Sequence, residues 1–480
     1  MMQGFGSMPL PFFLTLIALA FFLARGWKAR RQAWGIPTCA VLGTVAVWYV
    51  GDAFYNDYRI YQLVIDSASL TSAWWQVLLF VVVFGLLAKP ISEKFNSHLA
   101  NNNSHALVFM ETERLLQPKV QRQLDIVAAA MLFAWIILMI IAVIKVKGDV
   151  LGLFAPYLGH KTNPWARGQI GGGFSAIISL AAYFQIFLTA AFGVIAALAL
   201  NPKTRNMALA VCFLALPFYI FDRTRNTMLA TMMPGILAFV FLRLRRSKWV
   251  KLGFLVAAFL AVNAWFTFVM ASRGSGMSVS SSFVSEKIEE GDIEATKHLG
   301  LNMFEELAWI NHFFDTGRYQ PNWGRRYFAE LVNPIPRGLW KNKPTIGLDY
   351  AIARGQSTRG GEGEVTATIS TGMIGQGVVN YGPFLGPIAA AVLMGFWVAL
   401  LARQDLKGDD PGRLILYGCG LILTFNLGRD ITLLVLYPFL FGLIAYWFWN
   451  RYLRKDHFQK EEVYPPPSSN NPLPPKQKNP

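Results

Sequence analysis

Eleven long apolar runs dominate the sequence and limit what it can fold into. An α-helix needs roughly 20 predominantly apolar residues to cross the hydrocarbon layer of a bilayer. We therefore predict an all-α integral membrane protein with about eleven transmembrane helices. The runs lie near residues 8–24, 33–50, 71–88, 126–144, 173–200, 206–221, 226–242, 249–271, 377–402, 414–427 and 431–449.

The composition supports a membrane protein and argues against a nucleic-acid partner. Apolar residues make up 54% of the chain and charged residues only 15%, whereas soluble domains carry about 25% charge. The net charge of +16 fits the Lys and Arg excess of cytoplasmic loops. The three cysteines, Cys39, Cys212 and Cys419, all lie inside apolar runs, so we predict neither a disulfide framework nor a metal site for them.

Lys and Arg counts predict the orientation of the chain. If the connection at residues 25–31 is cytoplasmic, that side holds 25 basic residues. The opposite side holds 8 once the long loop 272–371 is left out, because long loops translocate largely regardless of charge. The N-terminus is therefore predicted outside and the C-terminus inside. No basic segment precedes the first apolar run, so we interpret that run as a retained span and not as a signal peptide.

Four segments follow from this topology. We predict transmembrane helices 1–8 in residues 1–271, a large and partly helical external loop in 272–371, and helices 9–11 in 372–449. The proline-rich tail 450–480 is too polar to bury a core and is predicted to be disordered and cytoplasmic.

The large external loop divides by charge. Residues 272–315 hold 3 basic and 8 acidic residues, and residues 316–361 hold 8 basic and 2 acidic. Arginine binds phosphate well because its planar guanidinium forms two parallel hydrogen bonds. We therefore expect the basic part to bind a phosphate-bearing ligand, and attraction to anionic lipid head groups is the alternative.

Three elements of this loop carry the expectation. Met303, Leu307, Ile310 and Phe314 repeat at helical spacing and predict an amphipathic helix on the membrane or over the bundle, with Glu305 and Glu306 solvated. Pro334 and Pro336, with one residue between them, predict a rigid turn in the segment 333–344 that holds Arg337 and Lys343 in place. Residues 354–364 are glycine-rich, and glycine lets backbone N–H groups approach an oxyanion closely. This segment contains Arg354, Arg359, Glu362 and Glu364.

Charged residues also stand at the ends of predicted spans, where charge is costly unless it is paired or functional. Arg223 and Arg225 lie in a short turn, Arg273 follows a span directly, and Arg429 precedes Asp430. Snorkelling, or an Arg429–Asp430 ion pair, is the structural alternative. The histidines have no metal-ligand spacing, and no nucleotide-binding or metalloprotease motif occurs, so we predict no metal and no cofactor.

Taken in order, these features resemble the Wzy-type family, the oligosaccharide repeat-unit polymerases of bacterial surface polysaccharides. The resemblance is carried by the Arg-bearing turn Phe221-Asp-Arg-Thr-Arg-Asn and by Asn333-Pro-Ile-Pro-Arg-x-x-Trp-x-x-Lys-Pro in the external loop. A glycine-rich entry to the next span, Gly372-Met-Ile-Gly-Gln-Gly-Val-Val-Asn-Tyr-Gly, completes it. The detailed match covers about residues 206–402.

This resemblance implies a GT-C-like bundle and metal-independent glycosyl transfer at the periplasmic face of the bacterial inner membrane. The implied partners are an undecaprenyl-diphosphate-linked oligosaccharide and membrane lipids, and a polysaccharide chain-length regulator is a further candidate. A diphosphate leaving group needs cationic stabilisation, and an acceptor hydroxyl needs a general base. The candidates for the base are Asp349, Glu362 and Glu364. The candidates for binding the diphosphate are Arg223, Arg225, Arg273, Arg337, Lys343, Arg354, Arg359 and Arg429.

Three alternatives stay open. An O-antigen ligase of the same fold would pass the finished glycan to a lipid A core. A flippase or transporter would bind the lipid without reacting it, although such proteins typically show internal repeats or broken helices with intramembrane charge, and none is visible in the sequence. The third is a mannosyl- or arabinosyl-type GT-C transferase. Such enzymes usually place an acidic motif in the first external loop, which here contains Asp52, Asp57 and Asp66, and this alternative is weakened but not removed.

Overall fold

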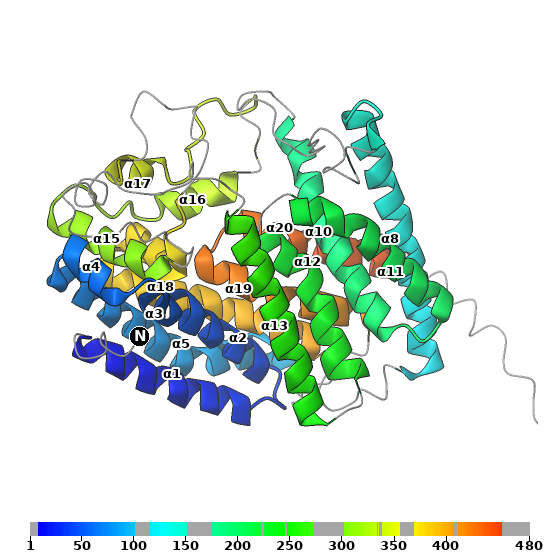
Figure 1. Ribbon diagram of the computed structural model, residues 1–480, viewed down its shortest axis with the longest axis horizontal. Coiled ribbons are helices and arrows are strands. Elements are labelled where there is room, and N and C mark those ends of the chain that lie inside the picture. The colour runs from blue at the N-terminus through cyan, green and yellow to red at the C-terminus, as the bar shows by residue number, and fades with distance from the viewer. Residues whose placement is uncertain are drawn as a thin grey trace, which may run out of the picture.

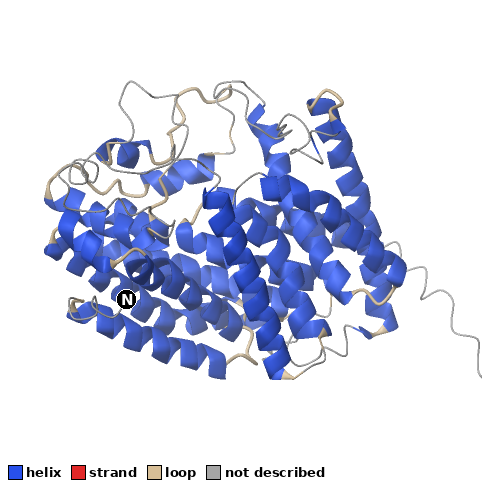
Figure 2. Ribbon diagram, viewed as in Figure 1, coloured by secondary structure: helices blue, strands red, loops and turns tan. Residues whose placement is uncertain are grey.

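The structure is a computed structural model in which every regular element of the described residues is a helix (Figures 1 and 2). The described residues are 8–100, 116–150, 153, 175–221, 225–244, 247–271, 302–333, 335, 338–355, 369–406 and 410–453. The predicted disorder of the tail concerns residues that, apart from 450–453, lie outside this set.

Each of the eleven apolar runs is helical over most of its described residues. The helical segments are α1 (Leu10–Lys28), α2 (Gly35–Val45) continued by η2 (Ala46–Gly51) and α3 (Asp52–Tyr55), α5 (Ser67–Phe95), α8 (Pro118–Lys145), α10 (Ser175–Leu198), α11 (Pro202–Phe221), α12 (Arg225–Ala238) continued by η4 (Phe239–Arg243), α13 (Lys248–Ala271), α18 (Gly372–Asp405), α19 (Pro411–Arg429) and α20 (Leu433–Phe448), which η7 (Trp449–Leu453) extends. Shorter helices are α4 (Tyr58–Val64), α6 (Ser97–Ala100), α15 (Met303–Asp315), α16 (Arg325–Val332) and α17 (Leu348–Ala353).

Six of these helical segments are long and apolar enough to cross a membrane: Leu10–Lys28, Gly35–Tyr55, Ser67–Phe95, Pro118–Lys145, Leu180–Leu198 and Gly372–Asp405. Large side chains such as Phe133 and Phe213 are exposed on the bundle surface, as expected where a helix faces lipid instead of water. The protein is thus an α-helical, multi-pass membrane protein by length and composition, and the count of eleven spans stays a prediction.

Helix α18 differs from the single span predicted at 377–402, because it is broken at Gly382. Gly382 has φ 82° and ψ 178°, a conformation that only glycine adopts readily, and Pro383 follows it. A Cβ on Gly377 would lie 2.2 Å from the carbonyl oxygen of Gly386, although nine residues of straight helix would separate the two by about 13 Å. The ten residues before Gly382 therefore form a half-helix that doubles back against the rest of α18.

This half-helix is enclosed by protein. Residues 371–380 are all buried, and the long part of α18 packs along α5. A break in a helix is tolerated at membrane depth only where the protein itself surrounds the backbone. The fold thus places the N-terminus of a buried half-helix at one end of the bundle.

Helix α15 covers the same end of the bundle, where Figure 1 shows α15, α16 and α17 together. The carboxylate of Asp52 accepts hydrogen bonds from the backbone N–H groups of Phe304 (2.7 Å) and Glu305 (3.2 Å). The ring of Phe304 stacks on Trp74 of α5, with 4.2 Å between the centroids. Gln76 of α5 and Asn311 of α15 exchange side-chain hydrogen bonds. The described part of the external loop is therefore docked firmly on the bundle.

One expectation for this helix is wrong. Glu305 and Glu306 are only 4% and 0% exposed, not solvated. The apolar stripe predicted helix α15 but did not reveal that the helix is covered on two sides. The bundle packs on one side of α15. On the other side lies α17, where Tyr350 donates a hydrogen bond to Glu306.

Candidate functional site

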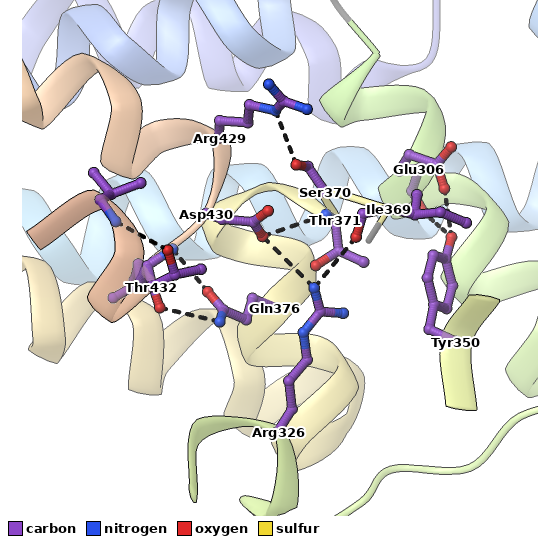
Figure 3. Close-up of polar contacts among 12 residues, drawn as sticks. Glu306, Arg326, Tyr350, Ile369, Ser370, Thr371, Gln376, Arg429, Asp430 and Thr432 are labelled. Atoms are coloured by element: carbon purple, nitrogen blue, oxygen red, sulfur yellow. Dashed lines mark hydrogen bonds and ion pairs between the residues drawn. The ribbon is translucent and has the colours of Figure 1, made fainter. Parts of the chain in front are cut away.

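The candidate site lies where one face of α16 meets the start of α18 and the turn between α19 and α20 (Figure 3). Residues 325, 328 and 331 of α16 are exposed, and residues 326, 329 and 330 are buried. This periodicity of three to four is that of an α-helix with one face packed against a neighbour. Arg326 and Glu330, one turn apart, therefore point inward together.

Arg326 is the central residue of this site. Its side chain is 2% exposed, and its Nη2 lies 3.8 Å from Oδ1 of Asp430 and donates to the carbonyl oxygen of Ile369 at 3.3 Å. Gly347 covers the guanidinium closely, since a Cβ there would lie 3.7 Å from Cζ. The buried Nε and Nη1 atoms have no hydrogen-bond partner. Buried charged donors are normally satisfied, so these two nitrogens mark a place for an acceptor.

The turn that carries Asp430 is fixed to the start of α18. The side chain of Gln376 accepts from the backbone N–H of Ile431 at 2.8 Å and donates to its carbonyl oxygen at 3.0 Å. Asp430 accepts from the backbone N–H of Thr371 at 3.4 Å, and Arg429 donates to Ser370 at 2.8 Å. Burial raises the pKa of Asp430, and the Arg326 guanidinium opposes this rise.

Three more buried polar atoms without a partner lie around Arg326: the Glu330 Oε2, the Tyr327 hydroxyl and the Thr371 hydroxyl. Thr371 is the N-cap residue of α18, and a helix N-terminus carries a partial positive charge. The site thus joins two arginines, one of them buried, to a positive helix end. It is suited to stabilise negative charge on a ligand oxygen.

Glu330 is held as a neutral acid in this surrounding. Burial raises the pKa of its carboxyl to about 8, from an ordinary value of 4.5, and the Arg326 charge only partly opposes the rise. At neutral pH the carboxyl can therefore donate a hydrogen bond as well as accept one.

The raised pKa of Glu330 predicts a pH dependence of stability. Between pH 4.5 and pH 8 the folded state keeps a proton that the unfolded state has released. The contribution of Glu330 to the free energy of unfolding is therefore full below pH 4.5 and declines as the pH rises to 8, by at most about 1.4 kcal/mol per pH unit. Glu330→Gln is expected to flatten this part of the profile in thermal unfolding of the detergent-solubilised protein.

The control is Glu93→Gln, which removes a glutamate whose side chain is 58% exposed. An unchanged pH profile in the Glu330→Gln protein, or an equal flattening in the Glu93→Gln protein, would contradict the assignment.

Arg354, which we named for the diphosphate, has internal partners instead of a free face. Its Nη2 and Nε lie 3.0 and 3.2 Å from the two carboxylate oxygens of Glu306, and its Nη2 lies 3.6 Å from Glu305. The guanidinium also covers the ring of Trp309, with 4.6 Å from Cζ to the centroid. Tyr350 donates to Glu306 at 2.6 Å. These contacts give Arg354 the environment of a structural ion pair.

The other predicted site residues are placed as follows. Lys343 donates to the carbonyl oxygens of Asn333 and Ile335, both at 2.8 Å, and so closes the proline turn. Asp349 is exposed and accepts from Tyr319 at 2.7 Å. Arg429 lies beside Asp430 at the candidate site. Outside the described part of the chain are the side chain of Arg225 and all of Arg223, Arg273, Arg337, Arg359, Glu362 and Glu364.

The acidic residues of the first external loop have partners within the protein. Asp52 holds the start of α15, and Asp57 pairs with Arg59 at 2.6 Å. Asp66 accepts from the backbone of Ser69 at the start of α5. Among the described residues, no group of histidine, cysteine or acidic side chains is arranged to hold a metal ion, and the absence of a metal stays a prediction.

Sequence reasoning counted Arg326 and Glu330 among the charges of the loop but did not select them. The sequence feature that could have indicated them is their spacing of four residues on one short helix, directly after the exposed Arg325. That spacing shows that the two share a face but not which way the face points.

Comparisons with protein-family models, with curated proteins and with solved structures found no match to this chain. Its class is therefore defined by the structure alone: a helical membrane protein with a buried, cationic site beneath a docked external loop.

Proposed function

We propose that this protein is a polysaccharide polymerase of the bacterial inner membrane. It transfers a growing glycan from undecaprenyl diphosphate onto a lipid-linked oligosaccharide repeat unit at the periplasmic face, as the resemblance to the Wzy-type family implies. The observation that carries the proposal is Arg326, a buried arginine with two donor nitrogens that have no hydrogen-bond partner.

The proposed chemistry matches the charges of the site. The bond between the anomeric carbon and the diphosphate oxygen breaks, and the diphosphate takes the electron pair. The acceptor hydroxyl forms the new bond to that carbon and loses its proton to a carboxylate. Charge develops on the leaving oxygen, where arginines and a helix N-terminus stabilise it without a metal. Arg326, Arg429 and the start of α18 supply these groups.

The carboxylate that takes the proton is Asp349, Glu362 or Glu364 in this proposal. Asp349 is exposed in the same loop as Arg326, within hydrogen-bond distance of Tyr319. Asn322 donates to Asp349 at 3.2 Å and accepts from the backbone N–H of Arg326 at 3.5 Å. This placement of Asp349 next to α16 supports it as the candidate base.

A flippase or transporter is the second candidate function, because α18 is broken. Discontinuous helices that end at a buried polar site are typical of transporters, and the half-helix before Gly382 begins beside Asp430. An O-antigen ligase of the same fold remains the second enzymatic reading, since it acts on the same lipid diphosphate.

The surface polysaccharide profile of a strain that lacks this protein tests the proposal. Loss of the long-chain ladder with survival of single-repeat caps on a gel is the expected result. Loss of both the ladder and the caps would replace the polymerase by a ligase or flippase. An unchanged profile would remove polysaccharide assembly as the function.

A further inference from the structure

The structure divides the basic residues of the external loop into two groups. Arg326 and Arg354 are buried, whereas Arg325 and Lys341 are exposed. Arg326 belongs to the candidate site and Arg354 to the ion pair with Glu306, whereas Arg325 and Lys341 lie on the surface of the loop.

The exposed basic residues lie beside large exposed apolar side chains. Phe328 and Leu331 follow Arg325 at helical spacing on the outer face of α16, and they are 49% and 66% exposed. Trp323, just before α16, and Leu339, in the proline turn, are each 74% exposed. Trp340 packs edge-on to Phe328, with 6.3 Å between the ring centroids, so the turn and the helix share one surface. We call Trp323, Arg325, Phe328, Leu331, Leu339 and Lys341 the outer face.

Such a surface is unusual where water is the only neighbour. Contiguous exposed apolar side chains mark a place where another surface docks. Contact with lipid hydrocarbon explains the exposed phenylalanines on the helices of the bundle, but α16 belongs to the external loop. Contact with the hydrocarbon around the bundle therefore does not account for the outer face, which is a candidate docking surface.

Charge and position identify the covering surface. The segment 333–343 contains basic but no acidic residues, and Glu330, the only acid of α16, points inward and is 4% exposed. Helix α16 packs on α18 and lies with α15 and α17 at one end of the bundle (Figure 1), the end that the predicted topology places at the non-cytoplasmic surface of the membrane. Tryptophan and basic residues around an apolar centre are typical of a surface that lies in the head-group region.

We propose that the outer face binds the surface of the same bilayer, with Phe328 and Leu331 in the interface and Arg325 and Lys341 on anionic lipid head groups. This binding holds α16 against the membrane and fixes the direction in which its inner face presents Arg326. The inference does not depend on the reaction that the protein catalyses.

Depth-dependent quenching in lipid nanodiscs tests this proposal on the full chain. Leu331→Cys is combined with replacement of Cys39, Cys212 and Cys419 by alanine, and an environment-sensitive fluorophore is attached. Lipids brominated in the acyl chains are expected to lower its emission about twofold, because interfacial side chains lie roughly 5–10 Å into the head-group boundary. The same label on Thr316→Cys, an exposed position at the end of α15, is expected to be quenched far less.

The contribution of Arg325 and Lys341 to binding of the bilayer surface is tested by changing the lipid composition. Quenching at Leu331→Cys is expected to be stronger with phosphatidylglycerol present than in phosphatidylcholine alone, because anionic head groups attract basic residues near the surface. Arg325→Gln with Lys341→Gln is expected to abolish this difference. The control Lys203→Gln with Lys248→Gln removes the same amount of charge from two exposed positions in predicted cytoplasmic connections. This control is expected to preserve the difference in quenching between the two lipid compositions.

Equal quenching at Leu331→Cys and Thr316→Cys would overturn the proposal. So would a blue-shifted emission at Leu331→Cys without quenching by brominated lipid, since a protein surface, either a second copy or another partner, would then cover the outer face.

Discussion

Arg326→Gln is expected to lower glycan transfer about 100-fold or more, the typical effect of removing one preorganised donor from a site that stabilises developing negative charge. The effect is large because Arg326 is buried and two of its nitrogens have no hydrogen-bond partner within the protein. The measurement is extension of a lipid-linked repeat unit by the purified protein, together with the polysaccharide ladder of a complemented deletion strain.

A matched control separates this effect from loss of charge in general. Arg318→Gln removes an arginine of the same loop that is exposed, and its activity is expected to stay within about threefold of the unchanged protein, because exposed charges are screened by solvent. If Arg326→Gln and Arg318→Gln gave equal activities, Arg326 would have no special role.

Structural damage needs a separate control, because Arg326 also lies beside Asp430. Removing one partner of a buried ion pair typically costs about 3–5 kcal/mol, since the other charge stays buried alone. The double variant Arg326→Gln, Asp430→Asn removes both charges and is expected to recover folded protein in the membrane but not activity. Recovery of activity together with folding would show that Arg326 serves only to neutralise Asp430.

The helices of this protein could be predicted from sequence because the bilayer restricts what an apolar run can do. A chain segment in hydrocarbon must satisfy its own backbone hydrogen bonds, so a long apolar run becomes a helix. Each predicted run overlaps a helical segment, and six helices of the described residues meet the length and hydropathy of a span. The break at Gly382 was missed, because a Gly-Pro pair inside an apolar run does not disclose that the chain turns back.

The site was less predictable, because its contacts join residues distant in sequence. The resemblance pointed to arginines of the external loop, and the apolar pattern of α15 located the element that caps the bundle. Neither could show that Arg354 pairs with Glu306, 48 residues earlier, or that Arg326 turns toward Asp430, which follows it by more than 100 residues. A count of charges along a loop does not distinguish an arginine that binds a carboxylate from one that is left for a ligand.

Arg354→Gln is therefore expected to act on folding, and to do so more strongly than Glu306→Gln. Arg354 stands between two carboxylates, Glu306 at 0% and Glu305 at 4% exposure. Without the guanidinium these two buried acids lose the cation between them, and the free energy of unfolding is expected to fall by about 3–5 kcal/mol. The measurement is thermal unfolding of the purified protein in detergent, with Lys119→Gln, at an exposed position of α8, as the control.

Glu306→Gln removes only one of the two carboxylates beside Arg354. It therefore tests whether loss of the arginine costs more stability than loss of one carboxylate. Arg354 retains Glu305 at 3.6 Å and the face of Trp309 at 4.6 Å, and a glutamine at position 306 can still accept from Tyr350. Its cost is expected to be about half that of Arg354→Gln, because no unpaired charge is created.

If Arg354→Gln unfolded at the temperature of the unchanged protein and lost only glycan transfer, Arg354 would be a ligand-binding arginine like Arg326, and the carboxylates around it would serve to position it. A fall in activity that matches the fall in folded protein would instead assign Arg354 to holding α17 on α15, leaving Arg326 as the buried arginine that meets the ligand.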